Sequence, residues 1–423
     1  MKSSKKIFIT PDQSIIAEKS FLDYRAWPVF ILAFIRLFYV SIFDRALSNY
    51  LYFVIDINES TLGFISSVGA IAYIFAPIIG QKITKKIGSR NALIIASTVT
   101  PILTGIQMIY FEPLFLIICR ISIGLSLGIF WPNCFNLLSK WQSVSSIEKS
   151  DRNFRNFNFS WNLGYILGLL IGFFWAFSLN DYFAMIISWS FTFLLIPVSF
   201  FIEKDSNSNQ GTENRLENTT SEVNSNKYDH SNSNTQLMLY PIIFSWISIA
   251  VLTISKSIFI FGYPVFLKSF EFPSYLTYLV QCGLQFMQVL GLTLINSVNI
   301  YKRKTIILIS TVAISFISVT IVFFGNLLYI SIILAISGLF LGFIHGLAMK
   351  IMLEYGTVEN TTKYSTINEI LIGMGFGITP IIAGYVFEVN IYAAFVFIAI
   401  LSFSALILLI YFSRAVKREN SRS

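Results

Sequence analysis

Twelve apolar segments, each about as long as a membrane-crossing helix, dominate this chain of 423 residues. A helix needs about 20 apolar residues to cross the hydrocarbon core of a bilayer, where the backbone has to satisfy its own hydrogen bonds. The segments lie at 28–54, 61–80, 91–111, 114–138, 155–177, 182–202, 238–262, 273–297, 304–324, 327–349, 366–387 and 390–412. The sequence therefore predicts an all-α membrane protein with twelve transmembrane helices.

The composition is that of a chain whose main solvent is lipid. Only 12% of the residues are charged, against about 25% in soluble domains. The three cysteines all lie in apolar segments, and the two histidines lie in unrelated regions. These features predict no disulfide framework, no metal site and no cofactor, and the chain has no glycine-rich phosphate loop. The net charge of +8 does not indicate a nucleic-acid partner, because its placement matters more than its sum.

A polar stretch divides the twelve segments into six and six. Residues 203–236 are rich in asparagine and serine and hold no aliphatic cluster, which is typical of a disordered linker. The predicted organisation is an N-terminal tail at 1–27, a first bundle at 28–202, the linker at 203–236, a second bundle at 237–412 and a C-terminal tail at 413–423.

The placement of lysine and arginine predicts the orientation, because cytoplasmic loops carry an excess of both. One set of loops and tails holds Lys82, Lys85, Lys86, Arg90, Lys302, Arg303, Lys304, Arg414, Lys417 and Arg418. The opposite loops hold Asp56, Glu59, Glu112, Asp181 and Glu388, with Lys268 as the clear basic exception. We therefore expect a multi-pass protein of the plasma membrane with the tails and the linker in the cytoplasm.

The two halves repeat each other in sequence. The stretch GLSLG at 124–128 recurs as GLFLG at 338–342, and both the fifth and the eleventh segments begin polar and become glycine-rich. The first and seventh segments each follow a proline and place a charged residue about sixteen positions later, Asp44 and Lys256. Internal repeats of this kind are typical of secondary transporters, whose binding site lies near the midplane between the halves.

Four motifs resemble those of the major facilitator superfamily. Arg120, Gly124, Gly128 and Pro132 form a pattern similar to its fourth-helix motif. The other three comprise Gly164 and Gly168 of the fifth segment, Gly373, Gly377 and Pro380 of the eleventh, and Gly80, Gly88 and Arg90 around the loop after the second. The resemblance implies two six-helix bundles that rock around a central cavity.

The loop after the second segment departs from the family pattern. Its usual aspartate is missing, since Thr84 and Lys85 occupy that region, and the corresponding loop of the second half contains no glycine. This departure leaves open a different class of protein, a membrane solute sensor on a transporter scaffold that does not itself transport.

Glycines at four-residue spacing create a smooth helix face, so that neighbouring backbones can approach closely where lipid offers no hydrophobic drive for association. We expect the motif glycines to pack helices within one chain rather than to touch a ligand. Dimerisation through the same faces is the alternative, but several such faces in one chain favour a monomer.

Polar and ionisable side chains inside the apolar segments are the candidate functional residues, because they are costly in lipid and usually face a cavity or a partner. The candidates for substrate binding are Asp44, Arg45, Asn162, Tyr165, Lys256, Gln281, Gln285 and Gln288. The candidates for coupling or gating are Arg120, His345 and Glu369. Arg36 is left out, because it is close enough to the cytoplasmic end to snorkel.

The three glutamines fall at i, i+4 and i+7, which places them on one stripe of a helix. A cavity wall is one interpretation of this stripe, and hydrogen bonding between helices is the other. For Asp44 and Arg45, pairing with each other or with a neighbour is the alternative to contact with a solute.

The deep charges lean positive, which favours a small organic anion as the solute of a gradient-driven secondary transporter. A proton-coupled exporter of drug-like or lipophilic compounds is the first alternative, with Asp44 as its proton and cation site. An enzyme is disfavoured, because no constellation of nucleophile, base or metal ligands lies at membrane depth.

Overall fold

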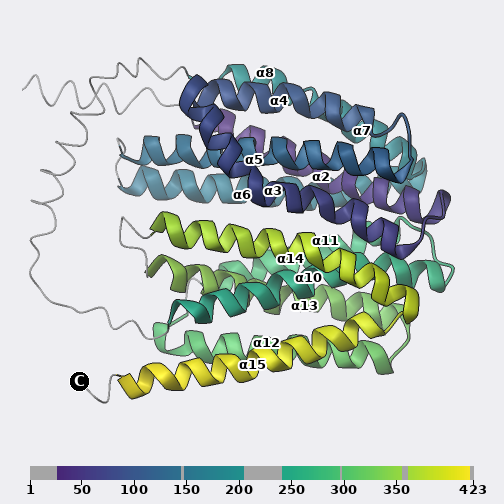
Figure 1. The fold of residues 1–423 in the computed structure, drawn as a ribbon, viewed down its shortest axis with the longest axis vertical. Coiled ribbons are helices and arrows are strands. Elements are labelled where there is room, and N and C mark those ends of the chain that lie inside the picture. Colours follow the sequence, from purple (N-terminus) through teal and green to yellow (C-terminus); the bar gives the residue numbers. More distant parts are fainter. Residues whose placement is uncertain (1–25, 144–146, 204–240, 296–297, 355–360, 420–423) are drawn as a thin grey trace, which may run out of the picture.

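The computed structural model describes residues 26–143, 147–203, 241–295, 298–354 and 361–419, which form helices joined by short connections without any strand. Nearly all of the predicted N-terminal tail and of the predicted linker lies outside these residues. The described chain forms two groups of helices that run alongside each other (Figure 1). The all-α, multi-pass fold predicted from the apolar segments is confirmed.

The first half holds the helices α2 (Trp27–Asn49), α3 (Glu59–Ile87), α4 (Ser89–Ile106), α5 (Pro113–Ser143), α6 (Ile147–Ser178), α7 (Asp181–Thr192) and α8 (Leu195–Phe200). A π-helical turn, Tyr50–Val54, extends α2, while α7 and α8 together form one candidate membrane span. The second half holds α10 (Ile242–Ser269), α11 (Leu276–Leu294), α12 (Arg303–Phe323), α13 (Leu327–Glu354), α14 (Thr361–Val389) and α15 (Ala393–Glu419).

Ten of the described helical stretches are long and apolar enough to cross a membrane. The helices α4 and α11 fill the places of the third and eighth predicted segments without being among those ten. Polar residues account for this, since α4 begins with Ser89, Arg90 and Asn91 and α11 carries three glutamines. Twelve predicted segments thus have helical counterparts, and two of them are more polar than the rest.

Local chemistry explains several helix ends. Asn58 caps α3 by accepting a hydrogen bond from the backbone N–H of Thr61 at 3.2 Å, and α3 ends at Gly88, whose φ of 83° favours glycine. The prediction for α10 was too short, because this helix continues past 262 to Ser269 with the buried Pro264 inside it. Proline is tolerated inside membrane helices because neighbouring helices and local adjustments satisfy the freed backbone groups.

The glycine repeats form matching seams in the two halves. A Cβ atom on Gly128 of α5 would lie 1.9 Å from the Cβ of Ala76 on α3, so that no side chain fits there. In the second half, a Cβ atom on Gly342 of α13 would lie 2.2 Å from the carbonyl oxygen of Gln288 on α11. Each half therefore uses its glycine pair to bring two backbones together.

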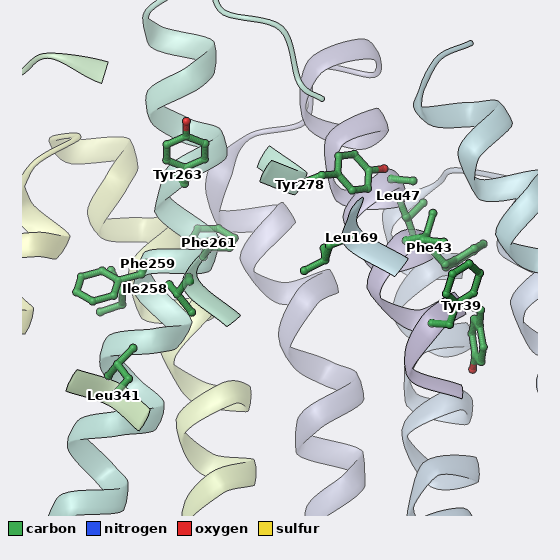
Figure 2. Close-up of a cluster of buried hydrophobic side chains, with 14 of the residues drawn as sticks. Tyr39, Phe43, Leu47, Leu169, Ile258, Phe259, Phe261, Tyr263, Tyr278 and Leu341 are labelled. Carbon is green, nitrogen blue, oxygen red and sulfur yellow. The ribbon is translucent and has the colours of Figure 1, made fainter. Parts of the chain in front are cut away.

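The two halves meet along two helix pairs, α3 against α14 and α6 against α11. Inside the halves, the apolar faces of α2 and α10 are buried, as Phe43 and Phe259 show in Figure 2. The outward faces of α12 and α15 instead expose large apolar side chains, including Phe316, Phe323 and Ile400. Exposed apolar faces on this scale are expected where the surrounding medium is lipid.

Candidate functional site

A cavity of about 240 Å³ lies between the two halves. Side chains from α2, α3, α5, α6, α10, α11 and α14 line it, so that both halves contribute. Its polar lining residues are Ser41, Asp44, Arg45, Ser48, Ser66, Arg120, Tyr165, Ser257 and Gln281. A cavity at this place, between two repeated halves, is where secondary transporters built from internal repeats bind their solutes.

Asp44 and Arg120 form an ion pair in this cavity. The Arg120 guanidinium on α5 donates to Oδ1 of Asp44 on α2 at 2.5 Å. The Asp44 side chain is 49% exposed and that of Arg120 is 12% exposed. The carboxylate therefore pairs with a neighbouring helix rather than with the adjacent Arg45, and half of it still faces the open space.

Arg45 is buried, with 7% of its surface exposed. Its Nε donates to Oε1 of Gln281 at 2.8 Å, and the amide nitrogen of Gln281 donates to the hydroxyl of Tyr165. Among the described residues, the ion pairs are Arg120 with Asp44 and Lys268 with Asp56. Arg45 consequently has an amide, and not a carboxylate, as its acceptor in this part of the chain.

Lys256 of α10 is held in the same manner. Its ammonium donates to Oε1 of Gln285 at 2.8 Å and to Oε1 of Gln288 at 2.6 Å. The amide nitrogen of Gln285 donates in turn to Oδ1 of Asn162 on α6 at 3.2 Å. Within the described residues no carboxylate lies within 4 Å of Lys256.

The eight residues predicted to bind substrate thus fall into one polar belt across the molecule. Asp44, Arg45, Tyr165 and Gln281 line the cavity. Gln285 and Gln288 lie one to two turns further along α11, and they bind the other two, Lys256 of α10 and Asn162 of α6. The glutamine stripe predicted from the sequence is the element that connects the two parts.

The three coupling candidates occupy different places. Arg120 belongs to the cavity. His345 lies on α13, and its Nδ1 is buried without a hydrogen-bond partner in the described part of the chain. Glu369 lies on α14, but its side chain is outside the described residues.

The interpretation of Arg36 as a snorkelling residue is wrong, because its side chain is 0% exposed. The guanidinium turns into the first half, where it donates to Oγ1 of Thr100 on α4. It lies 5.5 Å from the ring centroid of Tyr39 and 5.2 Å from that of Phe130. These aromatic faces attract a cation inside the bundle, so the side chain does not extend toward the membrane surface.

The family-motif residues sit mostly at helix contacts. Cβ atoms on Gly164 and Gly168 would meet Phe34 and Ser41 of α2, and those on Gly373 and Gly377 would meet Ile74 and Ile71 of α3. Gly80 faces the backbone of Gly128, and Gly124 faces that of Gly69. Arg90 donates to the backbone carbonyl of Ile202 at 2.6 Å. Pro132 and Pro380 lie inside α5 and α14, and Pro380 also lines the cavity.

A second group of polar contacts joins the halves at the outer end, which is the end opposite the predicted cytoplasmic loops. The sequence analysis did not predict these contacts. Asp181 of α7 accepts from the hydroxyl of Ser274 at 2.5 Å and from that of Tyr278 at 3.0 Å, both in the second half. Asn49 of α2 donates to the Asp181 carboxylate at 3.1 Å. These bonds connect the halves on one side of the cavity.

Lys268 adds a further link at this end. Its ammonium bonds to the Asp56 carboxylate and donates to the backbone carbonyl of Tyr52 at 2.7 Å. The same ammonium lies 4.1 Å from the centroid of the Tyr52 ring. The hydrogen bond and the charge of Lys268 lower the pKa of Asp56 below its ordinary value. The signal was present in the sequence, because Lys268 is the basic exception among the acidic outer loops.

Comparison with known protein families agrees with the resemblance found in the sequence motifs. The family model described as Major Facilitator Superfamily matches residues 29–355 and, in a second match, 246–423. No curated protein matches the chain.

Solved structures with the same fold include three transporters. The nucleoside transporter NupG aligns with a TM-score of 0.65 at 16% identity, over 92% of this chain and 98% of its own. A POT family transporter in complex with a thioalcohol-conjugated peptide aligns with a TM-score of 0.70 at 14% identity, over 92% and 96%. Another, in complex with 5-aminolevulinic acid, aligns with a TM-score of 0.68 at 13% identity, also over 92% and 96%.

Proposed function

Because the chain belongs to the major facilitator superfamily, and is therefore a multi-pass membrane transporter and not an enzyme, we propose that it carries a small organic anion by alternating access. Two cations carry this proposal, Arg45 in the wall of the cavity and Lys256 in the polar belt beside it. Arg45 and Lys256 are each bound by neutral glutamine oxygens in the described structure, and neither has a carboxylate within 4 Å. A charge removed from water is costly unless it is paired, so an anionic solute would complete the site.

The size of the cavity argues against export of drug-like compounds. Sites for drug-sized ligands usually measure about 300–1,000 Å³. This cavity measures about 240 Å³, and its walls combine three charged residues with apolar ones such as Leu62 and Phe376. Asp44, which a cationic drug would need, is already bound to Arg120.

The solved structures with this fold are compatible with a small solute. They are a nucleoside transporter and POT family transporters in complex with a peptide conjugate and with 5-aminolevulinic acid. Identities of 13 to 16% carry the fold and no more, so the choice of an anion rests on the residues of this chain.

We assign the coupling step to the pair of Asp44 and Arg120. A proton on Asp44 would weaken its bond to the guanidinium and free Arg120 to turn toward the solute. His345 and Glu369 remain further candidates for coupling or gating. The bonds of Asp181 and Lys268 between the halves support a chamber that is closed at the predicted outer end in this state.

The orientation and the transport unit belong to the same proposal. The loop charges favour an orientation with both termini in the cytoplasm, and we assign the protein to the plasma membrane. Since both halves that enclose the cavity come from one chain, a monomer is sufficient for transport.

Uptake into proteoliposomes tests the proposal. We expect labelled lactate or succinate to enter vesicles that contain the protein, and the Lys256→Gln variant to lose this uptake. The matched control is Lys350→Gln, because Lys350 is a partly buried lysine of the same half whose ammonium donates to the backbone carbonyl of Ile295 at 3.0 Å. This variant should transport normally.

Three results would overturn the anion proposal. Uptake of lipophilic cations that depends on Asp44, and is unchanged in Lys256→Gln, would support the drug-type exporter. Binding of an anion without any flux would support a sensor. Equal loss of uptake in Lys256→Gln and Lys350→Gln would show that the site has been misplaced.

A further inference from the structure

The charges of the polar belt and of the neighbouring Arg120 do not sum to zero. Asp44 and Arg120 neutralise each other across 2.5 Å. Arg45 and Lys256 stay without a carboxylate within 4 Å among the described residues, which leaves two positive charges at the site. A solute with one negative charge would neutralise only one of them.

The two cations come from different halves, and both are hydrogen-bonded to amides of one helix, α11. Arg45 lies on α2, and Lys256 lies on α10. Both donate to α11, Arg45 to Gln281 and Lys256 to Gln285 and Gln288. With a rise of about 1.5 Å per residue, Gln281 lies about 6 to 10 Å along the helix axis from the two glutamines that bind Lys256. The separation suits two carboxylates at the ends of a short carbon chain.

The glutamine oxygens can yield to a stronger acceptor. An amide oxygen is neutral, whereas a hydrogen bond from a cation to a carboxylate is roughly twice as strong as one between neutral groups. Gln281, Gln285 and Gln288 are all buried, so their oxygens hold the cations in place without neutralising them. A solute carboxylate would replace an amide oxygen at each cation and cancel its charge.

We propose that the solute is a small dicarboxylate that places one carboxylate at Arg45 and the other at Lys256. This inference rests on the proposed transport of organic anions and adds the number of charges and their placement. A dianion would connect α2 of the first half to α10 of the second, whereas a monoanion could engage one half only. Binding would thus couple the two halves through the solute itself.

Binding to the purified full-length protein in detergent tests this inference by isothermal titration. The probes are succinate, glutarate and adipate, each compared with the monocarboxylate of the same chain length, such as butyrate for succinate. We expect the best dicarboxylate to bind about tenfold more tightly than its monocarboxylate, since one further charged hydrogen bond is made.

Single neutralisations sharpen the test. In Lys256→Gln and in Arg45→Gln, one cation remains, so the preference for the dicarboxylate over its monocarboxylate should fall to about twofold or less. The Lys350→Gln control should keep the full tenfold preference. A thermal-shift measurement with the same ligands provides a second readout of binding.

The outcomes separate the two proposals. If butyrate binds wild-type protein as tightly as succinate does, the dicarboxylate inference is wrong and the transport of organic anions stands. If no carboxylate binds, while lipophilic cations do, both proposals fail together. If the preference survives in both Lys256→Gln and Arg45→Gln, these two residues are not the partners of the carboxylates.

Discussion

The helices α2 and α10 occupy corresponding places in the two halves, yet the charged residues at matching positions, Asp44 and Lys256, have different partners. On α2, Asp44 forms an ion pair with Arg120 of α5. On α10, Lys256 is surrounded by amides. At the place of Arg120 in the repeat, four residues before the first glycine, the second half has the buried Leu334.

This contrast shows how a repeated scaffold becomes asymmetric at its functional centre. The glycine seams that hold each half together are preserved on both sides. Among the described residues, each half keeps one cation without a carboxylate, Arg45 in the first and Lys256 in the second, while the buried ion pair of Asp44 and Arg120 belongs to the first half. Symmetry serves the packing of the bundles, and the two unbalanced cations create a demand for an external anion.

The largest effect should come from the glycine seams, where the halves are alike. We expect Gly128→Val and Gly342→Val each to lower the free energy of unfolding by about 3 kcal/mol, because the new side chain has to displace backbone atoms. Thermal unfolding in detergent measures both. Gly283→Ala is the control, since a Cβ atom there would lie 3.1 Å from the Cβ of Ala335 and meet no backbone. A strong effect in one half only would show that the two seams are not equivalent.

Much of this architecture could be predicted from the sequence. The apolar segments and the glycine spacing depend on residues close together in the chain, and the repeat compares two such stretches, which is why the helices and the seams follow from them. The stripe of Gln281, Gln285 and Gln288 was also visible, because three positions on one helix face need no tertiary information.

Partners across the fold could not be predicted in the same way. Nothing in the sequence distinguishes Arg45 from Arg120 as the partner of Asp44, because the choice depends on how α2 and α5 cross. Arg36 was misjudged for a related reason, since its depth along α2 suggested snorkelling while its direction toward Thr100 and Phe130 is set by tertiary packing. Distance along a helix can be read from a sequence, but the direction in which a long side chain turns cannot.

The next prediction is that neutralising Arg120 and neutralising Lys256 change the free energy of unfolding in opposite directions. We expect Arg120→Gln to lower the free energy of unfolding by about 2 kcal/mol, because it leaves Asp44 without its cation. Breaking a buried pair typically costs about 3–5 kcal/mol, and the partial exposure of Asp44 reduces this. Lys256→Gln should instead raise stability by about 1 kcal/mol without ligand, because it removes a charge that has no counter-charge.

Chemical denaturation of the two variants and of the Asp44→Asn, Arg120→Gln double variant measures this difference. The double variant should recover part of the lost stability, since it leaves no charge unpaired. Destabilisation of similar size in Arg120→Gln and Lys256→Gln would show that Lys256 is compensated within the protein, which contradicts the unbalanced charge on which both proposals rest.

The smallest effect concerns the link between the halves at the outer end, where Lys268 bonds to Asp56. The bond lowers the pKa of Asp56, so this carboxylate contributes stability above its unfolded pKa of about 3.9. The contribution is lost as the pH falls through the lowered pKa of the folded state.

Because the pair of Lys268 and Asp56 is exposed, added salt should weaken it as well. We therefore expect Asp56→Asn to lower the melting temperature slightly at pH 6 and low salt, and the difference from wild type to shrink as the pH falls below about 4 and in 1 M salt. A difference that stays constant across pH and salt would mean that Asp56 acts through packing of its loop, and that the halves are held at this end by Asp181 and its hydroxyl partners alone.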